Sequence, residues 1–244
     1  MRSRRSYLFF AIMGVLFLAI AVAGFGPSFL LPLLDGNFEF PFAVFVHAGI
    51  MFGWLGLFIA QAVLASVGPR RLHKHFGTAS LILFLMIMAS GVTLSIANFL
   101  EDLPQPIEAR LDSIFFLQLW TFVLVPLFFW LGYRERRRSP EKHMRYMLLL
   151  TFFLIEAAAS RITFLPGMAD DETFIYAQYI YLDAILIPLF VYDWKQLGRI
   201  SPATFTGCGI LFFYQCTAMA MWGNEQWLKV ADTLDNWLSV HWPI

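Results

Sequence analysis

The sequence predicts an all-α integral membrane protein of seven transmembrane helices, with the N-terminus inside, the C-terminus outside, and a C-terminal amphipathic helix at the outer interface. Hydrophobic residues make up 59% of the 244-residue chain and charged residues only 14%, whereas soluble domains carry roughly 25% charged residues. Apolar runs of membrane-spanning length recur along the chain. Basic residues then gather in every second break between these runs, as they do in multi-pass proteins.

The transmembrane helices are predicted from the length of the apolar runs. A helix needs about 20 predominantly apolar residues to cross a bilayer. Turn-forming pairs such as Gly68-Pro69 and Pro166-Gly167 separate the runs. The predicted spans, all within one transmembrane domain over residues 1–222, are Tyr7–Phe25, Phe42–Ser66, Thr78–Leu100, Ser113–Tyr133, Arg145–Leu165, Phe174–Trp194 and Ala203–Trp222.

The positions of Lys and Arg predict the direction of the helices. Basic residues occur at the N-terminus and in the second, fourth and sixth breaks; of the 17 Lys and Arg residues, only Arg110, Arg161 and Lys229 lie elsewhere. The other breaks carry acids such as Glu101 and Asp170. Because basic loops stay on the cytoplasmic side, the N-terminus is predicted to be inside. The formal net charge of zero gives no indication of a nucleic-acid partner.

The first apolar run has a second interpretation. Its Arg-rich start and the Ala21-Val22-Ala23 sequence also resemble a secretory signal peptide. The run is about 18 residues long, and signal peptides have apolar regions of about 7–15 residues. The length favours a permanent first helix, and cleavage would leave the remaining topology unchanged.

The tail over residues 223–244 differs from the spans. It is too short and too charged to cross a membrane, because Lys229, Asp232 and Asp235 interrupt it. Its apolar side chains share one face at helical spacing, namely Trp227, Ala231, Leu234 and Leu238. We predict an amphipathic helix in the outer interface, where Trp is favoured.

Several polar side chains lie at membrane depth. Ionisable residues there are costly and usually functional. They fall between the midplane and the outer surface, together with amides such as Gln118. The sequence therefore predicts a polar pocket in the outer half of the bundle, formed by His47, Gln118, Glu156, Arg161 and Asp183.

The pairing of these side chains follows from helix geometry. Glu156 and Arg161 are five residues apart, so they point about 140° apart on a helix and do not pair within it. We expect Arg161 to pair with Asp183, and Glu156 with His47 or a Tyr. His47 and Glu156 together could also coordinate a transition metal or relay protons. The alternative for each pair is a purely structural contact between helices.

A second cluster of histidines is predicted at the inner face. His73, His75 and His143 flank basic residues there. Imidazole is the commonest metal ligand, so these side chains could bind a metal or haem. Basic loops with histidine also bind anionic lipid headgroups. His47 and His73 lie on the order of 20 Å apart, too far to share a metal at about 2 Å from each.

Two short motifs carry a resemblance to known sequences. Leu72-His73-Lys74-His75-Phe76-Gly77, and His143-Met144-Arg145-Tyr146-Met147 followed by Arg161, resemble the LHxxxG and HxRxM…R motifs of a family of uncharacterised bacterial multi-pass membrane proteins. In that family an early helix carries a histidine, like His47 here. The resemblance covers the second to fifth spans, and it implies a bacterial cytoplasmic (inner) membrane protein in which His47, His73, His143 and Arg161 belong to one pattern.

The sequence leaves several functions open. The leading hypothesis is that the outer pocket binds a small ligand, a metal ion or a proton. The alternative is an accessory or assembly subunit that binds partner membrane proteins, favoured by the 18% aromatic content and by the small face formed by Gly49, Gly53 and Gly56. The absence of inverted repeats disfavours a transporter. An enzyme acting on a lipid or quinone would require an acid–base pair, for which only His47 and Glu156 qualify.

Overall fold

The computed structural model describes residues 5–36, 39–101, 104–105 and 107–242. All regular secondary structure in these ranges is helical, which confirms the all-α prediction. Arg2 and Arg4 of the predicted basic N-terminus, Asp102, and positions 243–244 of the predicted tail lie outside the described residues.

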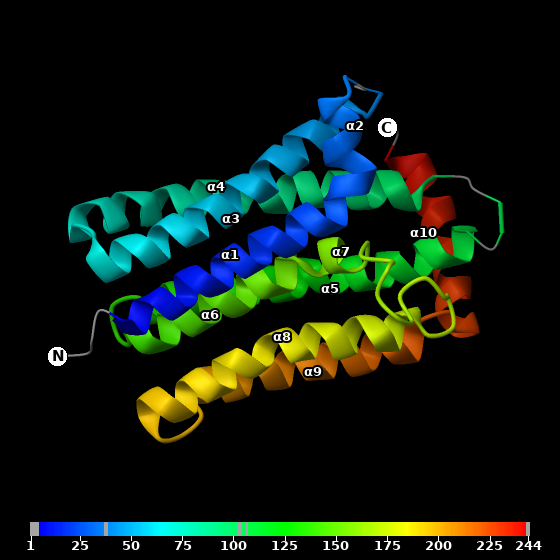
Figure 1. Cartoon of the computed structure of the whole chain (residues 1–244). Coiled ribbons are helices and arrows are strands. Elements are labelled where there is room, and N and C mark those ends of the chain that lie inside the picture. The colour runs from blue at the N-terminus through cyan, green and yellow to red at the C-terminus, as the bar shows by residue number, and fades with distance from the viewer. Residues whose placement is uncertain (1–4, 37–38, 102–103, 106, 243–244) are drawn as a thin grey trace.

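The long helices run along one direction and alternate in sense, as Figure 1 shows. These helices are α1 (Arg5–Phe25), α3 (Phe42–Val67), α4 (Arg70–Phe99), α5 (Ile107–Glu135), α6 (Pro140–Leu154), α8 (Phe174–Leu197) and α9 (Pro202–Met221). Shorter elements follow two of them: the π-helix η1 (Gly26–Leu30) with α2 (Leu31–Leu34), and α7 (Glu156–Ala159). Helix α10 (Glu225–His241) lies across one end of the bundle.

Within the described residues, five helical segments are long and apolar enough to cross a membrane. They are Tyr7–Leu34, Phe42–Val67, Arg71–Phe99, Ile107–Glu135 and Phe174–Leu197. The chain is therefore a multi-pass membrane protein, and the bilayer is its solvent. Helix α6 has only 15 residues, and the 20 residues of α9 include polar ones such as Tyr214 and Gln215.

The second half of the predicted fifth span is wrong. We expected one helix over Arg145–Leu165, but α6 ends at Leu154, where the Ile155 N–H donates to the Phe152 carbonyl 3.2 Å away. Only the four residues of α7 follow before an irregular segment over residues 160–173. Tertiary contacts explain the break, because Glu156 is bonded by side chains of α8 and α9.

The interior is densest around α6. Leu148, Leu149 and Leu150 are completely buried, so this helix has neighbours on all sides. Trp54 of α3 donates its Nε1–H to the Thr151 hydroxyl, 3.1 Å away. Such burial of the whole circumference explains how a helix of 15 residues is held at the centre of the bundle.

A buried ion pair lies at the basic end of α6. The Arg145 guanidinium donates from Nε to the Asp193 carboxylate of α8 at 2.8 Å, and a second nitrogen bonds the same oxygen. The other Asp193 oxygen accepts the Ser201 backbone N–H at 2.8 Å, at the start of α9. Arg145 and Asp193 are 1% and 0% exposed, so this contact joins α6, α8 and α9 without solvent.

The predicted C-terminal helix forms as α10, but its apolar face packs on the bundle. Trp227 and Ala231 are buried against Phe99 and Phe115, which stack at 3.9 Å between centroids. Trp227 also donates its Nε1–H to the Asp112 carbonyl at 2.9 Å. The apolar face is therefore covered by the start of α5 and the end of α4, and the position of α10 at the outer interface stays a prediction.

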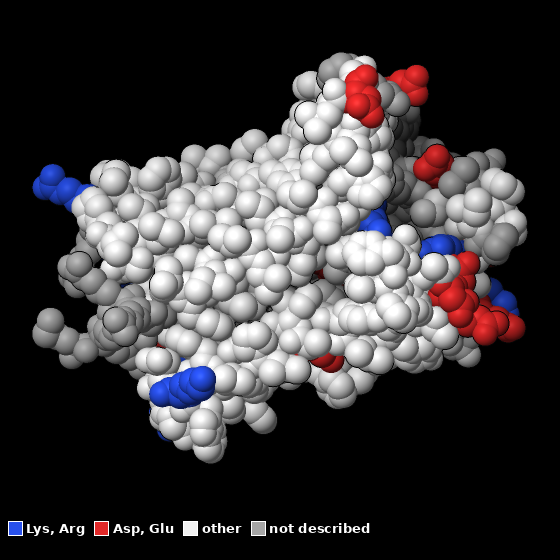
Figure 2. Space-filling view, in the orientation of Figure 1, with Lys and Arg blue, Asp and Glu red and all other residues white. Residues whose placement is uncertain are grey.

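Charges divide between the two ends of the bundle. Figure 2 shows acidic side chains gathered at the end that carries α2 and α10, with a few basic ones among them, and Lys and Arg side chains at the opposite end. The long sides between the ends carry few charges in this view. This is the charge distribution expected of a bundle that lies along the membrane normal.

Candidate functional site

A cavity of about 740 Å³ opens in the half of the bundle nearest α10. Helices α1, α3, α4, α5 and the α6–α7 segment surround it, with smaller contributions from α8 and α9. Ligand sites in proteins are mostly apolar cavities of about 300–1,000 Å³ with a few convergent polar groups. The walls here match that description, since aromatic and aliphatic side chains predominate and polar ones are few.

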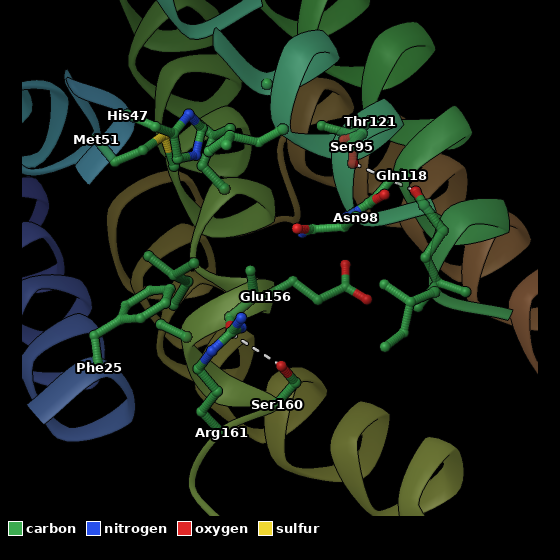
Figure 3. A pocket seen from close by; sticks show the side chains of 18 of the residues that line it. Phe25, His47, Met51, Ser95, Asn98, Gln118, Thr121, Glu156, Ser160 and Arg161 are labelled. Carbon is green, nitrogen blue, oxygen red and sulfur yellow. Dashed lines mark hydrogen bonds between the residues drawn. The ribbon is translucent and has the colours of Figure 1, made fainter. Parts of the chain in front are cut away.

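The polar residues come from opposite walls, as Figure 3 shows. His47 lies on the α3 side, Asn98 and Gln118 lie on the α4 and α5 side, and Glu156 and Arg161 lie below them. Four helical regions far apart in the sequence therefore contribute polar side chains to one space. These five residues include four of the five that the sequence indicated for the outer pocket.

Glu156 is the first residue of α7, directly after the break in α6. One oxygen of its carboxyl group accepts hydrogen bonds from the Tyr214 hydroxyl at 2.7 Å and from Gln178 Nε2 at 2.9 Å. Tyr214 in turn accepts a hydrogen bond from the Tyr179 hydroxyl at 3.2 Å. Within the described residues no Lys, Arg or His forms an ion pair with Glu156. Only neutral donors therefore bind this carboxyl group.

Gln178 carries an unsatisfied acceptor. Its side chain is 2% exposed and lines the cavity. Its Nε2 is bonded to Glu156, but its Oε1 has no hydrogen-bond partner among the described residues. A buried polar atom without a partner costs about 1–3 kcal/mol. This oxygen has essentially no accessible surface, so a molecule in the cavity does not reach it.

Arg161 lies on the cavity wall just after α7. It donates from Nη1 to the Ala157 carbonyl at 2.5 Å, and its guanidinium lies 4.7 Å from the centroid of the Phe25 ring. The expected pair with Asp183 is not formed, although both residues are described. Asp183 is exposed outside the cavity lining and accepts a hydrogen bond from Gln215 Nε2 at 2.9 Å.

A second arginine reaches the cavity from α5. Arg110 lines it near the acidic end and pairs with Asp171 at 2.6 Å. Its guanidinium also lies over the Phe174 ring at 5.1 Å from the centroid. Arg110 is therefore neutralised by a carboxylate, whereas Arg161 has no carboxylate partner among the described residues.

His47 is not placed as a partner of Glu156. Its Nδ1 lies 2.9 Å from the Ser90 hydroxyl of α4, a contact between neighbouring helices. Glu156 is instead bonded by a tyrosine, which was the other expected option. Throughout the described ranges, no group of three or more His, Cys, Asp or Glu side chains is arranged to hold a metal ion.

The three histidines predicted at the inner face lie at the end of the bundle far from the cavity. His143 Nδ1 contacts the Gly132 carbonyl at 2.8 Å, and His75 Nδ1 contacts the Arg71 carbonyl at 2.9 Å. His73 Nδ1 is buried without a partner among the described residues. The motif pattern is thus divided in space, since His47 and Arg161 line the cavity whereas His73 and His143 do not.

A glycine of α1 holds α7 in place. A Cβ atom on Gly24 would overlap the carbonyl oxygen of Ala158, so only glycine allows this approach. The π-helix η1 begins two residues later and contributes Ser28 and Phe29 to the cavity wall. Helix α1 therefore supports the segment that carries Glu156 and Arg161.

Sequence reasoning missed Tyr214, Gln215, Arg110 and Asp193. Tyr214 and Gln215 are adjacent polar residues within an apolar run, which was the available signal. Asp193 was placed at the end of a span, where a charge usually meets water, but it is fully buried. Comparisons with protein families, with curated proteins and with solved structures find no match to this chain.

Proposed function

We propose that this chain is a seven-span protein of the bacterial cytoplasmic membrane, N-terminus inside and C-terminus outside, whose outer cavity binds a small and largely apolar molecule. The charge asymmetry of the two ends supports the orientation. The parallel course of α6 and α9 with the five apolar segments supports seven crossings. The bacterial origin rests on the motif resemblance around His73 and His143.

One observation carries the ligand-binding proposal. A largely apolar cavity of about 740 Å³ has in its wall the Glu156 carboxyl group and the Arg161 guanidinium, and neither forms an ion pair within the described residues. A protein interior that only needed to pack would fill this volume. A bound molecule would fill it and could bond these two groups. A metal at His47 and Glu156 is less well supported, because each already contacts a different neighbour.

The test is to fill the cavity. Gly91 of α4 lines it, and a Cβ there would meet only the Phe122 ring at 3.9 Å, so Gly91→Trp would project into the open volume. Gly49 of α3 is exposed outside the lining, and a Cβ there would meet no atom within 4 Å, so Gly49→Trp is the matched control. Each protein is extracted with its surrounding lipid by a styrene–maleic acid copolymer.

Molecules bound to each sample are then released by organic solvent and quantified by mass spectrometry. We expect one compound to be enriched over the bulk membrane in the wild type and in Gly49→Trp, and depleted in Gly91→Trp. Equal compositions in all three samples would contradict the proposal. Circular dichroism and gel filtration check that both variants remain folded.

The accessory-subunit function remains the second candidate because of Asp183. This carboxyl group lies about 14 Å along α8 from its start, and its side chain is exposed rather than buried. Charged side chains in a membrane normally face the bundle interior or a partner. A subunit with a basic side chain at this depth would cover Asp183, and Asp183→Leu would then release that subunit from the purified complex.

A further inference from the structure

The unpaired ionisable groups of the cavity indicate the chemistry of its ligand. On one wall, one oxygen of the Glu156 carboxyl group accepts hydrogen bonds from the Tyr214 hydroxyl at 2.7 Å and from Gln178 Nε2 at 2.9 Å, both neutral donors. No Lys, Arg or His of the described residues forms an ion pair with this carboxyl group. A carboxyl group without a basic partner favours a ligand group with several N–H donors.

A primary ammonium group meets these requirements best. It carries three donors and a positive charge, so it could bond the Glu156 carboxylate and neutralise it. The nearby aromatic wall also suits a cation. Tyr214 lines the cavity and packs edge-on against Phe153, with 5.2 Å between the ring centroids. Aromatic faces attract cations that have lost their water.

The opposite charge is present on the same segment. Arg161 has one guanidinium nitrogen bonded to a backbone carbonyl and no carboxylate partner among the described residues. Guanidinium binds phosphate and carboxylate groups well because its donors form a fork. Besides the paired Arg110, the cavity therefore contains one carboxyl group and one guanidinium, five residues apart in the sequence, that form no ion pair among the described residues.

We propose that the ligand is a zwitterionic amphiphile, whose ammonium group binds Glu156, whose anionic group binds Arg161, and whose apolar chain lies along the cavity walls. This inference rests on the proposed ligand-binding function and adds the class of ligand. An ammonium and a phosphate joined by a short spacer are present both in phosphoethanolamine lipids and in the free headgroup. The apolar majority of the lining favours the lipid form.

The experiment compares two probes that share a chain and a phosphate. Lauroyl lysophosphatidylethanolamine carries the ammonium group, and lauroyl lysophosphatidylglycerol carries hydroxyl groups in its place. Each is titrated against the detergent-solubilised full chain, and bound probe is counted by native mass spectrometry. We expect the ethanolamine probe to bind at least about tenfold more tightly, the ratio produced by one charge-assisted hydrogen bond.

Single substitutions test which residue binds the ammonium group of the probe and which binds its phosphate. Glu156→Gln should remove the preference for the ammonium probe and leave binding of the glycerol probe unchanged. Arg161→Gln should weaken both probes, because both carry the phosphate. Asp183→Asn, an acid-to-amide change outside the cavity lining, is the matched control and should bind both probes like the wild type. A preference for the ammonium probe that survives in Glu156→Gln would overturn the assignment.

Further measurements distinguish a lipid ligand from a free headgroup, and the zwitterion proposal from the more general proposal that the cavity binds a ligand. Binding of free O-phosphoethanolamine in a Glu156-dependent way would support the same chemistry with a soluble ligand, and binding of the lysolipid alone would support the lipid form. Equal affinity of both lysolipid probes for the wild type, lost in Gly91→Trp, would overturn the zwitterion proposal and leave the cavity as a ligand site. Absence of binding by any probe, with no compound displaced by Gly91→Trp, would overturn both.

Discussion

Asp193 and Glu156 are acidic side chains of the same helical bundle, but their surroundings differ. Asp193, at the basic end, is bonded by the Arg145 guanidinium and by the Ser201 N–H. Glu156, in the half that contains the cavity, receives hydrogen bonds among the described residues only from the neutral groups of Tyr214 and Gln178. The Asp193 carboxylate has a charged partner within the protein, whereas the Glu156 carboxyl group has none among the described residues.

The same difference extends to the regions around them. Side chains of α6 next to Arg145 are closely packed, and Leu148 and Leu149 are completely buried. Beyond the break at Ile155, the chain turns away and borders open volume. The basic end is therefore closely packed around a paired carboxylate, whereas the half that contains the cavity has two ionisable groups, Glu156 and Arg161, without an ion pair among the described residues. Substitutions should affect stability in the first region and binding in the second.

The largest expected effect is on stability, from Asp193→Ala. Removal of the carboxylate leaves the buried Arg145 without a counter-charge, which costs about 3–5 kcal/mol of unfolding free energy. Unfolding in mixed micelles of increasing denaturing detergent measures this loss. The double variant Arg145→Met, Asp193→Leu should recover much of it, because no buried charge remains. A loss below about 1 kcal/mol in the single variant would contradict the role of the pair.

A smaller loss is expected from Gly24→Ala, at the boundary of the two regions. The added methyl group would overlap the Ala158 carbonyl, so α7 must shift, at a cost of about 2 kcal/mol. Because α7 carries Glu156, retention of the ligand should fall as well. Gly26→Ala is the control, since a Cβ there meets no atom within 4 Å. Equal unfolding curves for the two variants would show that the close approach is unimportant.

Tyr214→Phe should have a modest effect on folding and a clear one on binding. It removes the hydroxyl that bonds both Glu156 and Tyr179, at a cost of about 1 kcal/mol. The Glu156 carboxyl group then loses its closest donor and its fixed orientation. Native mass spectrometry with lauroyl lysophosphatidylethanolamine should show weaker binding. Unchanged affinity would mean that Tyr214 does not orient Glu156.

The smallest expected effect is that of Trp227→Phe in α10. The ring remains to pack against Phe116, but the Nε1–H bond to the Asp112 carbonyl is lost, at a cost below about 1 kcal/mol. Faster cleavage by trypsin at Lys229, with unchanged unfolding of the bundle, would show a loosened α10. Cleavage at the wild-type rate would show that ring packing alone holds this helix.

Much of the fold follows from the sequence because hydropathy and charge act locally. Runs such as Phe42–Ser66 and Phe174–Trp194 predicted α3 and α8 to within a few residues. Long-range contacts account for the failures. The break after Leu154 depends on Gly24 and on side chains of α8 and α9, which no local pattern reveals.

The candidate site was predictable only as a set of residue types. Ionisable side chains are energetically costly inside a membrane, and this cost indicated Glu156 and Arg161 as site residues. Their partners, however, depend on the arrangement of distant helices. Tyr214 lies 58 residues from Glu156 in the sequence. Asp183 was expected in the pocket because it lies at a similar depth, yet depth does not determine which way a helix face points, and Asp183 faces outward.

The most direct test of the central claim compares Glu156→Gln with Asp193→Asn, measuring ligand retention and unfolding free energy for each. Both substitutions remove one charge and keep the size of the side chain. The structure predicts that Glu156→Gln unfolds like the wild type but loses the bound compound, whereas Asp193→Asn unfolds more readily and retains the compound while folded. A Glu156→Gln protein that retains the compound and loses stability would contradict the account, because Glu156 would then serve the fold like Asp193.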